Sequence, residues 1–199
     1  MIKAIEPLGK HDRAVFSCGV AALDHWFHLR AGQDEKRNVA RVFVAIDDER
    51  GIVGFYSLSS FTLTIADLPP EYAKRLPRYD LIPAVLIGRL ARDERVRGEG
   101  VGDLLLADAV RRVISASRSL AVFAIVVEAS DKQAAAFYRD FGFAPFPNRP
   151  LRLFMPVSEA AEAASRALSQ LKMTSSVKAI ARAFQRVCRH NGVSTDHRQ

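Results

Sequence analysis

Apolar positions in the first 65 residues follow two different periods, which predict one helix and two strands. In residues 20–36 they recur every three or four positions, and the face that they form comprises Val20, Leu23, Trp26, Phe27 and Arg30. We therefore expect an amphipathic helix there, beginning near Cys18 and Gly19. The β-branched and aromatic runs at 39–47 and 52–65 predict two strands, and the polar break between them predicts an antiparallel hairpin.

The rest of the pattern alternates between strands and helices. Residues 66–83 are rich in proline and charge, which predicts a loop with one short helical turn. Strands are predicted at 84–94, 120–129 and 150–157. A helix should open at the glycine-rich residues 97–102, and a shorter one should run from Asp131 to Phe141 and end at a left-handed Gly142. The longer helix has an apolar side formed by Leu104, Leu105, Ala109, Val110 and Val113. This order indicates an α/β fold, with a mixed central β-sheet flanked by helices.

The C-terminal residues differ in pattern from the rest of the chain. For 199 residues we expect one domain at 1–157 and a basic, helical C-terminal extension at 158–199. Ser158 is expected to cap an alanine-rich helix, and a second, basic amphipathic pattern begins at Ser176. The extension supplies +4 of the formal net charge of +7. We expect it to add affinity for a polyanion, and a marginal terminal helix with no part in the chemistry is the alternative.

Composition and targeting signals are those of a cytoplasmic protein. Hydrophobic residues make up 49% and charged residues 26%, as in globular proteins. No apolar run approaches the roughly 20 residues that span a bilayer, and the N-terminus lacks the apolar segment of a signal peptide. Cys18 and Cys188 form no C-x-x-C pair, and no acidic or cysteine ligand stands at metal-motif spacing beside His25 and His28. We therefore expect a cytoplasmic location, no membrane association and no metal.

Three glycines in five positions, Gly98, Gly100 and Gly102, mark the turn before the longer helix. A turn without Cβ atoms can direct successive N–H groups at a phosphate, and the helix N-terminus adds a partial charge of about half a unit. A pyrophosphate would fit there, while a plain tight turn explains such a run equally well on its own. The spacing matches neither the P-loop nor the dinucleotide-binding pattern, which disfavours NTP and NAD as ligands.

Arg97, Gly100 and Gly102 match R-x-x-G-x-G, the pyrophosphate-binding motif of the GNAT acetyltransferases. The likeness extends in the family's order through FSCGVAALDHWF (16–27), VARVFVAID (39–47), GFYSLS (54–59), IGRLARDERVRGEGVGDLLLADA (87–109) and AAAFYRDFGFAP (134–145). Over nearly all of residues 1–156 the chain resembles the GNAT-type toxins of bacterial type II toxin–antitoxin systems. The resemblance implies a GNAT acetyltransferase domain at 1–157, N-acetyltransferase activity and acetyl-CoA as co-substrate.

The resemblance also implies where acetyl-CoA binds. The strand at Leu90, Ala91 and Arg92 is implied to give backbone groups to the pantetheine arm. The residues implied to hold the pyrophosphate are Arg97, Gly98, Glu99, Gly100, Val101 and Gly102. A carboxylate would repel a pyrophosphate, so we expect the side chain of Glu99 to face solvent. Asp131 falls where relatives often have Asn near the cofactor, and an N-cap role explains this residue equally well.

Tyr138 is the implied catalytic residue, in the segment F-Y-x-x-F-G-F. Helical period alone would make it a core residue, because it lies among Ala134, Phe137 and Phe141. A phenol has a reference pKa of about 10, so it is protonated at neutral pH and can give its proton to the CoA sulfur. We therefore expect Tyr138 to be the general acid. No carboxylate at a family position is an obvious base, which suits an acceptor amine whose pKa is about 8.

The resemblance to the toxins implies aminoacyl-tRNA as the acceptor, with acetylation of the α-amino group inhibiting translation. Basic residues that suit tRNA binding gather near the first helix, in the proline-rich loop and along the cofactor strand: Arg30, Lys36, Arg37, Arg41, Lys74, Arg75, Arg78, Arg89, Arg92, Arg95 and Arg97. A small-molecule or protein N-acetyltransferase is the alternative and would have an acidic acceptor pocket. A non-catalytic CoA-binding or interaction protein is a second alternative. The implied partners are a ribbon-helix-helix antitoxin and a second copy of the chain in a homodimer.

Overall fold

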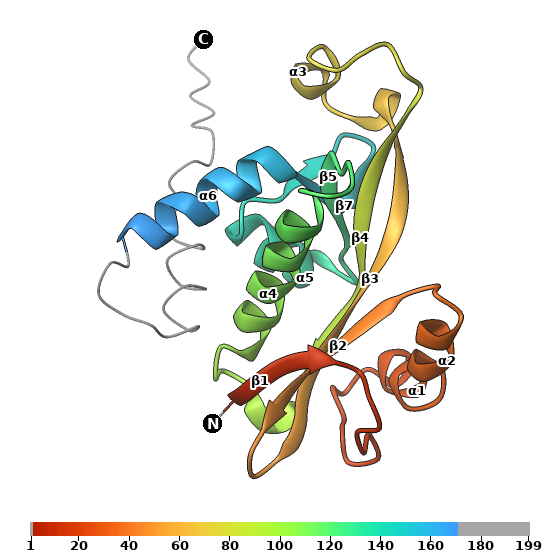
Figure 1. The fold of residues 1–199 in the computed structure, drawn as a ribbon, viewed down its shortest axis with the longest axis vertical. Coiled ribbons are helices and arrows are strands. Elements are labelled where there is room, and N and C mark those ends of the chain that lie inside the picture. The colour runs from red at the N-terminus through yellow and green to blue at the C-terminus, as the bar shows by residue number, and fades with distance from the viewer. Residues whose placement is uncertain (1, 171–199) are drawn as a thin grey trace.

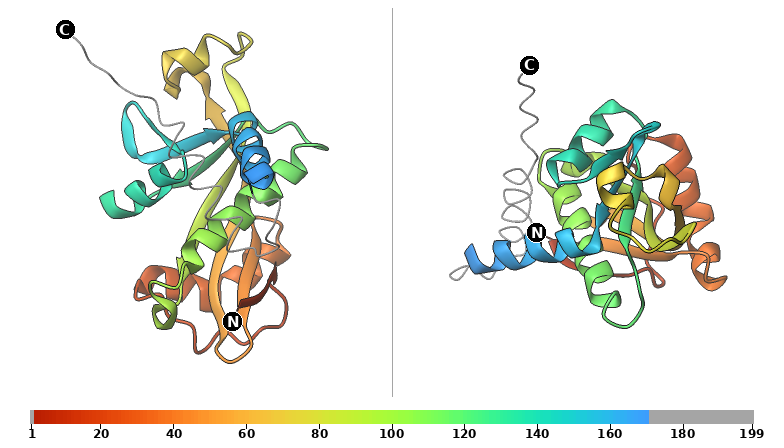
Figure 2. Two further views of the ribbon diagram at one scale, coloured as in Figure 1. Left: turned by 90° about the vertical axis from the view of Figure 1, so that its left-hand side faces the viewer. Right: turned by 90° about the horizontal axis from the view of Figure 1, so that it is seen from above.

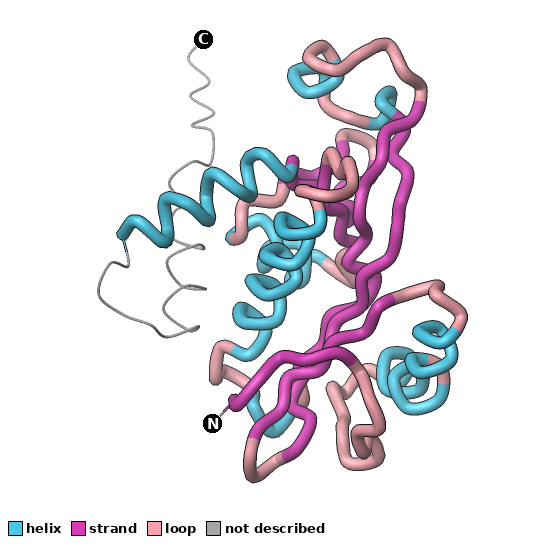
Figure 3. Tube along the Cα trace, in the orientation of Figure 1, coloured by secondary structure: helices cyan, strands magenta, loops and turns pink. Residues whose placement is uncertain are grey.

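The computed structural model describes residues 2–170, and within them a seven-stranded sheet forms the centre of the molecule (Figures 1 and 3). The strands are β1 (Ile2–Pro7), β2 (Arg41–Asp47), β3 (Gly51–Thr64), β4 (Leu81–Arg92), β5 (Ala124–Glu128), β6 (Ala144–Phe146) and β7 (Arg149–Pro156). Their order across the sheet is β1-β2-β3-β4-β5-β7-β6. Among these described strands, β4 and β5 pair in parallel and every other neighbouring pair is antiparallel. The expected mixed sheet is confirmed.

Helices cover both faces of this sheet. They are α1 (Ala21–Leu29), α2 (Ala31–Lys36), α3 (Pro70–Ala73), α4 (Val101–Ala116), α5 (Lys132–Asp140) and α6 (Val157–Gln170), with 3-10 turns η1 (Ile65–Asp67) and η2 (Glu94–Val96). Helices α4 and α6 lie on one face, and α1 and α2 lie on the opposite face (Figures 1 and 2). Helix α3 stands at the far end of the long β3–β4 hairpin (Figure 1). None of the helices in the described range is long and apolar enough to cross a membrane.

The largest buried cluster joins α4, α5 and α6 to one face of the sheet. The side of α4 that the apolar period predicts is buried, with Leu105 and Ala109 at 0% exposed, so this prediction is confirmed. On the opposite face, a second cluster packs α1 against β2 and β3, where the rings of Phe27 and Phe55 are stacked with centroids 4.1 Å apart. A third cluster on that face joins the α3 loop to strands β3, β4, β5, β6 and β7, around Leu63 and Phe154.

The predicted single helix at 20–36 is wrong, because the chain forms two helices that meet at Arg30. Ala31 is fully buried directly after the break, and the indole Nε1 of Trp26 donates a hydrogen bond of 2.8 Å to Asp34 of α2. These contacts hold α2 against α1 instead of in line with it. Arg30, which the period places on the apolar face, is therefore exposed.

Strand boundaries also differ from the sequence prediction. Strand β4 begins three residues before the predicted 84, and β5 begins only at Ala124. Strands β1 and β6 are not predicted, because one has a half-polar pattern and the other spans three residues. The short helical turn within 66–83 is confirmed as α3, and Gly142 has the expected left-handed conformation, with φ of 88°.

The last described helix belongs to the same core as the sheet. Helix α6 begins at Val157, so Ser158 lies inside the helix and does not cap it as expected. Ala160, Ala163 and Ala167 are buried in the cluster that also contains the apolar side of α4. The second helical pattern predicted from Ser176 lies outside the described residues.

Candidate functional site

The glycine-rich turn joins β4 to α4, and its backbone requires glycine at two positions. Gly98 and Gly100 have φ of 80° and 76°, a left-handed conformation that strains residues with a Cβ atom. Gly100 is the N-cap of α4. The approach to the turn is fixed by the buried carboxylate of Asp93, which accepts a hydrogen bond of 3.2 Å from the N–H of Ser17 and is bound by Arg95.

Four backbone N–H groups of this turn are without an intramolecular acceptor. Within residues 2–170, nothing accepts a hydrogen bond from the N–H of Gly98, Gly100, Val101 or Gly102. The last three belong to the first turn of α4, whose N–H groups have no partner inside a helix. We call these four groups the amide cluster. They carry the positive end of the helix dipole, and Arg97 beside them is exposed, so the turn has the chemistry of an anion site.

Glu99 lies next to the amide cluster and is held away from it by a cation. Arg50, in the turn between β2 and β3, donates a hydrogen bond of 2.8 Å from Nη1 to Oε1 of Glu99. The carboxylate side chain is 46% exposed, as expected for a group that would repel a phosphate. The ion pair with Glu99 raises the pKa of Arg50. The negative charge is therefore balanced on the outer side of the turn.

Strands β4 and β5 separate beside the same turn. Their pairing ends at Ile87 and Val127, and β4 then continues to Arg92 with β3 as its neighbour on one side. The N–H of Asp93 bonds to Val53 on β3, so the alternation of an antiparallel ladder turns the backbone groups of Leu90 and Arg92 away from β3. Those groups face the space between β4 and β5. Ala91, by the same alternation, bonds to β3, and its side chain packs in the cluster around Phe55.

Tyr138 is the predicted catalytic residue, and its ring is buried in the largest core cluster at 7% exposed. Burial raises the pKa of its phenol to about 12. The ring meets Phe137 and Phe143 edge to face, with centroids 5.3 and 5.8 Å apart. Phe137 also approaches the start of α4, since a Cβ on Gly102 would lie 3.7 Å from its ring. Helix α5 thus brings Tyr138 to the end of the sheet at which the amide cluster lies.

Asp131, a predicted cofactor contact, is the N-cap of α5. Its Oδ1 accepts a hydrogen bond of 2.8 Å from the N–H of Ala134, and its Oδ2 accepts one of 3.0 Å from Ser130. These hydrogen bonds, the one from Ala134 first, lower the pKa of its carboxyl group. The N-cap role that the sequence allows is confirmed.

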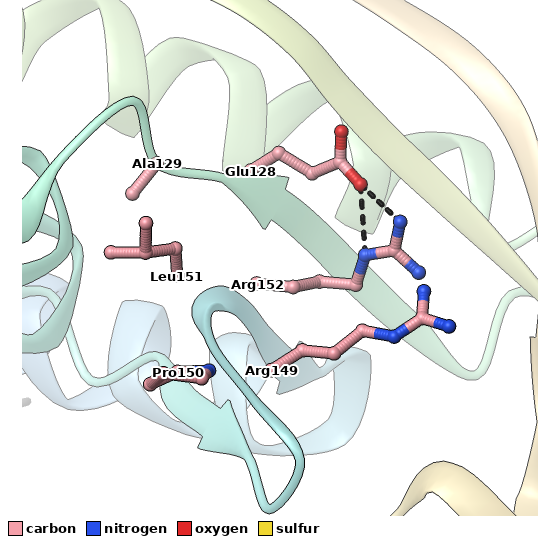
Figure 4. A pocket seen from close by; sticks show the side chains of 6 residues that line it. All are labelled: Glu128, Ala129, Arg149, Pro150, Leu151 and Arg152. Carbon is pink, nitrogen blue, oxygen red and sulfur yellow. Dashed lines mark hydrogen bonds and ion pairs between the residues drawn. The ribbon is translucent and has the colours of Figure 1, made fainter.

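An open cavity of about 390 Å³ lies between the end of β5 and the start of β7, next to the point at which β4 and β5 separate (Figure 4). It is lined by Glu128, Ala129, Arg149, Pro150, Leu151 and Arg152. The guanidinium of Arg152 binds the carboxylate of Glu128 and lies over the ring of Phe61, 5.6 Å from its centroid. Outside the lining of the cavity, the guanidinium of Arg89 on β4 lies over the ring of Trp26, 4.2 Å from its centroid. The charged side chains that line the cavity are Arg149, Arg152 and Glu128, which together carry a formal charge of +1.

The basic residues that the sequence groups together do not all remain available to a ligand. Arg95 donates from Nε and Nη2 to the carboxylate of Asp93, both at 2.8 Å, so it stabilises the approach to the glycine-rich turn. Arg41 is bound by Asn38. Lys74, Arg75 and Arg78 belong to the loop that follows α3, at the opposite end of the molecule from α1 (Figure 1).

Sequence reasoning missed four residues that the fold brings to this region: Arg50, Glu128, Arg149 and Arg152. Each depends on contacts between distant segments, for example 49 residues apart for the pair of Arg50 with Glu99. The position of Glu128 at the last residue of a buried strand, beside the cofactor strand, was the one signal that could have drawn attention to it. No group of three or more potential metal ligands occurs in the part of the chain described.

Comparison with known proteins gives matches over most of the chain. Residues 38–145 match the family described as "Acetyltransferase (GNAT) domain". A protein of Sinorhizobium fredii named "Probable toxin TacT" is 33% identical over 78% of this chain and 92% of its own length. The "tRNA-acetylating toxin" of Mycobacterium tuberculosis is 37% identical over 75% of this chain and 88% of its own length.

Two solved structures give the same picture. AtaT in complex with acetyl-methionyl-tRNAfMet is 30% identical, with a TM-score of 0.74 over 80% of this chain and 97% of that one. A mutant of the AtaT toxin bound to the C-terminus of the antitoxin AtaR and to acetyl-CoA is 26% identical, with a TM-score of 0.67 over 80% of this chain and 96% of that one.

Proposed function

This chain belongs to the GNAT acetyltransferase family, and we propose that it is a toxin that acetylates the α-amino group of aminoacyl-tRNA and thereby inhibits translation. Its reaction is N-acetyl transfer from acetyl-CoA. The observation that carries the proposal is the separation of β4 from β5 beside the amide cluster. Beyond Ile87 and Val127 the parallel strands β4 and β5 separate, next to the amide cluster. The backbone groups of β4 and the amide cluster can therefore bind one long ligand that carries phosphates.

The amide cluster and Arg97 fit the pyrophosphate of acetyl-CoA, because unpaired N–H groups and a cation are what such an anion binds. The backbone groups of Leu90 and Arg92 fit the amides of the pantetheine arm, which would pair with β4 as a strand does. Ala91 supports this strand from its other side. When bound, acetyl-CoA supplies the thioester carbon that the amine attacks. In this arrangement Asp131 supports the site by capping α5.

We assign Tyr138 as the general acid. A bond forms between the amine nitrogen and the acetyl carbon, and the bond from that carbon to sulfur breaks. The phenol gives its proton to the departing sulfur, and the nitrogen loses one proton through water, which restores the phenol. Because burial raises the pKa of Tyr138 to about 12, the hydroxyl keeps its proton across the physiological range. It is therefore always ready to donate.

The charge of the cavity beside the separation favours an acceptor that carries phosphates. An enzyme for polyamines or protein amines would offer an acidic pocket, whereas this cavity has Glu128 with Arg149 and Arg152. The 3′ end of an aminoacyl-tRNA carries one amine next to a chain of phosphodiesters. Its amine can pair with the carboxylate of Glu128, and its phosphodiesters can pair with the guanidinium groups of Arg149 and Arg152.

The partners follow from the relatives. AtaT binds the C-terminus of its antitoxin AtaR, and we propose that this chain likewise has an antitoxin. We further propose that the antitoxin is a ribbon-helix-helix protein, that the toxin is a homodimer, and that it acts in the cytoplasm, where charged tRNA and acetyl-CoA are found. The support for these three is the resemblance of the sequence to the toxin family.

The test is an acceptor competition. The purified protein is incubated with labelled acetyl-CoA and a mixture of charged total tRNA, free amino acids and polyamines. We expect the label on the amino acid of charged tRNA, released as N-acetyl amino acid by mild base. Label on polyamines or free amino acids would replace the proposal by a small-molecule acetyltransferase. No transfer to any acceptor, with acetyl-CoA bound, would indicate a binding protein.

A further inference from the structure

Glu128 lies where β4 and β5 separate, on the face of the sheet opposite α4 and α5. Val127 is the last residue of β5 in register with β4, so Glu128 is the first residue beyond the paired region. Side chains alternate along a strand, and Val126 belongs to the cluster around Leu63 and Phe154, on the face opposite α4 and α5. Glu128 therefore points to that face. Because α4 and α5 cover the other face, an acceptor reaches the separation from the side of Glu128.

The carboxylate of Glu128 has one oxygen held and one oxygen available. Nε of Arg152 donates to Oε1 at 2.8 Å, and Nη2 of the same guanidinium donates to that oxygen as well. Within residues 2–170 no hydrogen bond to Oε2 is formed, and Figure 4 shows this oxygen on the side of the carboxylate away from Arg152. The side chain of Glu128 is half exposed, so a ligand can reach this oxygen from solvent.

We propose that Oε2 of Glu128 accepts a hydrogen bond from the α-amino group of the acceptor and orients it toward the thioester, with Arg152 as a positioning residue that fixes the carboxylate. The inference rests on the proposed function, since it concerns how that site recognises its amine. An amine held by a carboxylate keeps its lone pair directed at the separation between β4 and β5. A purely structural role, in which the pair only joins β5 to β7, predicts that Glu128→Gln leaves the preference for charged tRNA unchanged.

Arg149 explains why a carboxylate at this position does not repel a nucleic acid. Its guanidinium lies beside that of Arg152 in the cavity (Figure 4), and no acidic side chain in the described range forms an ion pair with it. The cavity thus keeps a net positive charge with Glu128 ionised. The amine of an aminoacyl-tRNA can pair with Glu128 while its phosphates pair with the guanidinium groups. A tRNA without its amino acid offers the phosphates only.

The experiment measures how strongly the protein distinguishes charged from uncharged tRNA. The probe is the charged tRNA that the wild-type protein acetylates best, compared with the same tRNA after mild base has removed its amino acid, both without acetyl-CoA. For Glu128→Gln we expect the preference for charged tRNA to fall about 10- to 100-fold, as for the loss of a hydrogen bond to a charged group, and kcat/KM to fall equally. Affinity for uncharged tRNA and for acetyl-CoA should be unchanged or slightly higher.

Two further variants separate recognition from folding. Glu162→Gln removes the acid of another exposed ion pair, with Arg166 on α6, and should change neither preference nor turnover. Glu128→Asp keeps the charge one methylene further back and should restore part of the preference. Since Glu128 is half exposed, all variants should melt within about 2 °C of the wild type. Wild-type acetylation of charged tRNA with an unchanged preference in Glu128→Gln would overturn this inference alone. Absence of wild-type acetylation of any charged tRNA would overturn the proposed function and the inference with it.

Discussion

Burial has two opposite effects on the phenol of Tyr138. It raises the pKa to about 12, which keeps the hydroxyl protonated but makes it a weaker acid than a phenol in water. The CoA thiol, with a pKa close to that of cysteine at about 8.5, would by itself not remove that proton. The transfer is favourable only if the nitrogen returns a proton to the phenol, so proton gain and loss at Tyr138 must be closely linked.

The first prediction follows from this residue. Tyr138→Phe removes the proton donor but leaves the ring contacts with Phe137 and Phe143. We expect acetyl-CoA binding to be unchanged by calorimetry and turnover to fall about 10²- to 10⁴-fold. Turnover close to that of the wild type would remove Tyr138 from the mechanism.

The second prediction concerns Gly100, whose backbone matters for two reasons. Gly100→Val strains the left-handed backbone, which costs about 1–2 kcal/mol of stability, and crowds the amide cluster. Gly51 has a similar φ of 69°, and a Cβ at either position meets no atom within 4 Å, so Gly51→Val is a matched control. Both variants should melt at similarly lowered temperatures, and only Gly100→Val should weaken acetyl-CoA binding, by about tenfold or more. Equal affinity in the two variants would disprove the anion site.

At the scale of elements, Asp108 on α4 joins three parts of the fold. It accepts hydrogen bonds of 2.5 Å from the hydroxyl of Tyr56 on β3 and 2.7 Å from Arg112, which also reaches the carbonyl of Ile5 on β1. Burial alone would raise the pKa of Asp108, but hydrogen bonds from Tyr56, Arg111 and Arg112 outweigh it and lower the pKa. A lowered pKa means that this stabilisation is present above about pH 4 and is lost as the pH falls further.

The third prediction tests this network. Asp108→Asn should reduce the free energy of unfolding at pH 7 by about 3 kcal/mol, as when one partner of a buried ion pair is removed. The difference from the wild type should shrink as the pH is lowered below about 4, measured by urea unfolding. Asp48→Asn, in the exposed pair with Lys3, is the control and should cost less than about 1 kcal/mol. A difference that does not depend on pH would show that the charge of Asp108 has no part in it.

The fourth prediction concerns the hairpin turn that touches the glycine-rich turn. Arg50→Gln leaves the charge of Glu99 unbalanced beside the amide cluster. We expect the dissociation constant of acetyl-CoA to rise about two- to fivefold, as for an exposed ion pair, and less at high salt. Adding Glu99→Gln should restore the affinity, because the repelling charge is gone. If the double variant bound acetyl-CoA as weakly as Arg50→Gln does, Arg50 would have to bind the ligand directly.

How much of each element could be predicted depended on how local its causes are. The apolar side of α4 and the left-handed Gly142 follow from neighbouring residues, and both were predicted. The break at Arg30 depends on the contact between Trp26 and Asp34, and β1 exists because β2 offers it a partner. The glycine-rich turn was visible in the sequence, while the ion pairs that surround it join segments that only the fold brings together.

At the scale of the whole molecule, the fifth prediction concerns the charge of the C-terminal residues. Residues 171–199 contain six Lys or Arg and one Asp, a balance of +5 out of the total of +7. Deleting them should leave acetyl-CoA binding unchanged, raise KM for charged tRNA and flatten its dependence on salt, because fewer counterions are released. Truncation after 157 would not test this, since it removes the buried Ala160, Ala163 and Ala167 of α6.

The control for this truncation keeps the full length. Replacing Lys178, Arg182, Arg186 and Arg189 with Gln should reproduce most of the change in salt dependence. An identical KM and salt slope in the truncated protein would show that the C-terminal residues do not contribute to tRNA affinity.

The opening between β4 and β5 also makes the stability of the folded protein depend on its ligand. A ligand that binds only the folded chain stabilises it by about 2.7 kcal/mol at one hundred times its dissociation constant. Acetyl-CoA, lying along Leu90 and Arg92 in the place of a strand, would be such a ligand. Without this ligand, the edge of β4 beyond Ile87 has no strand partner on the side of β5, and such an edge is open to pairing with other chains and to proteolysis. We therefore expect acetyl-CoA at saturating concentration to slow the proteolysis of the purified protein.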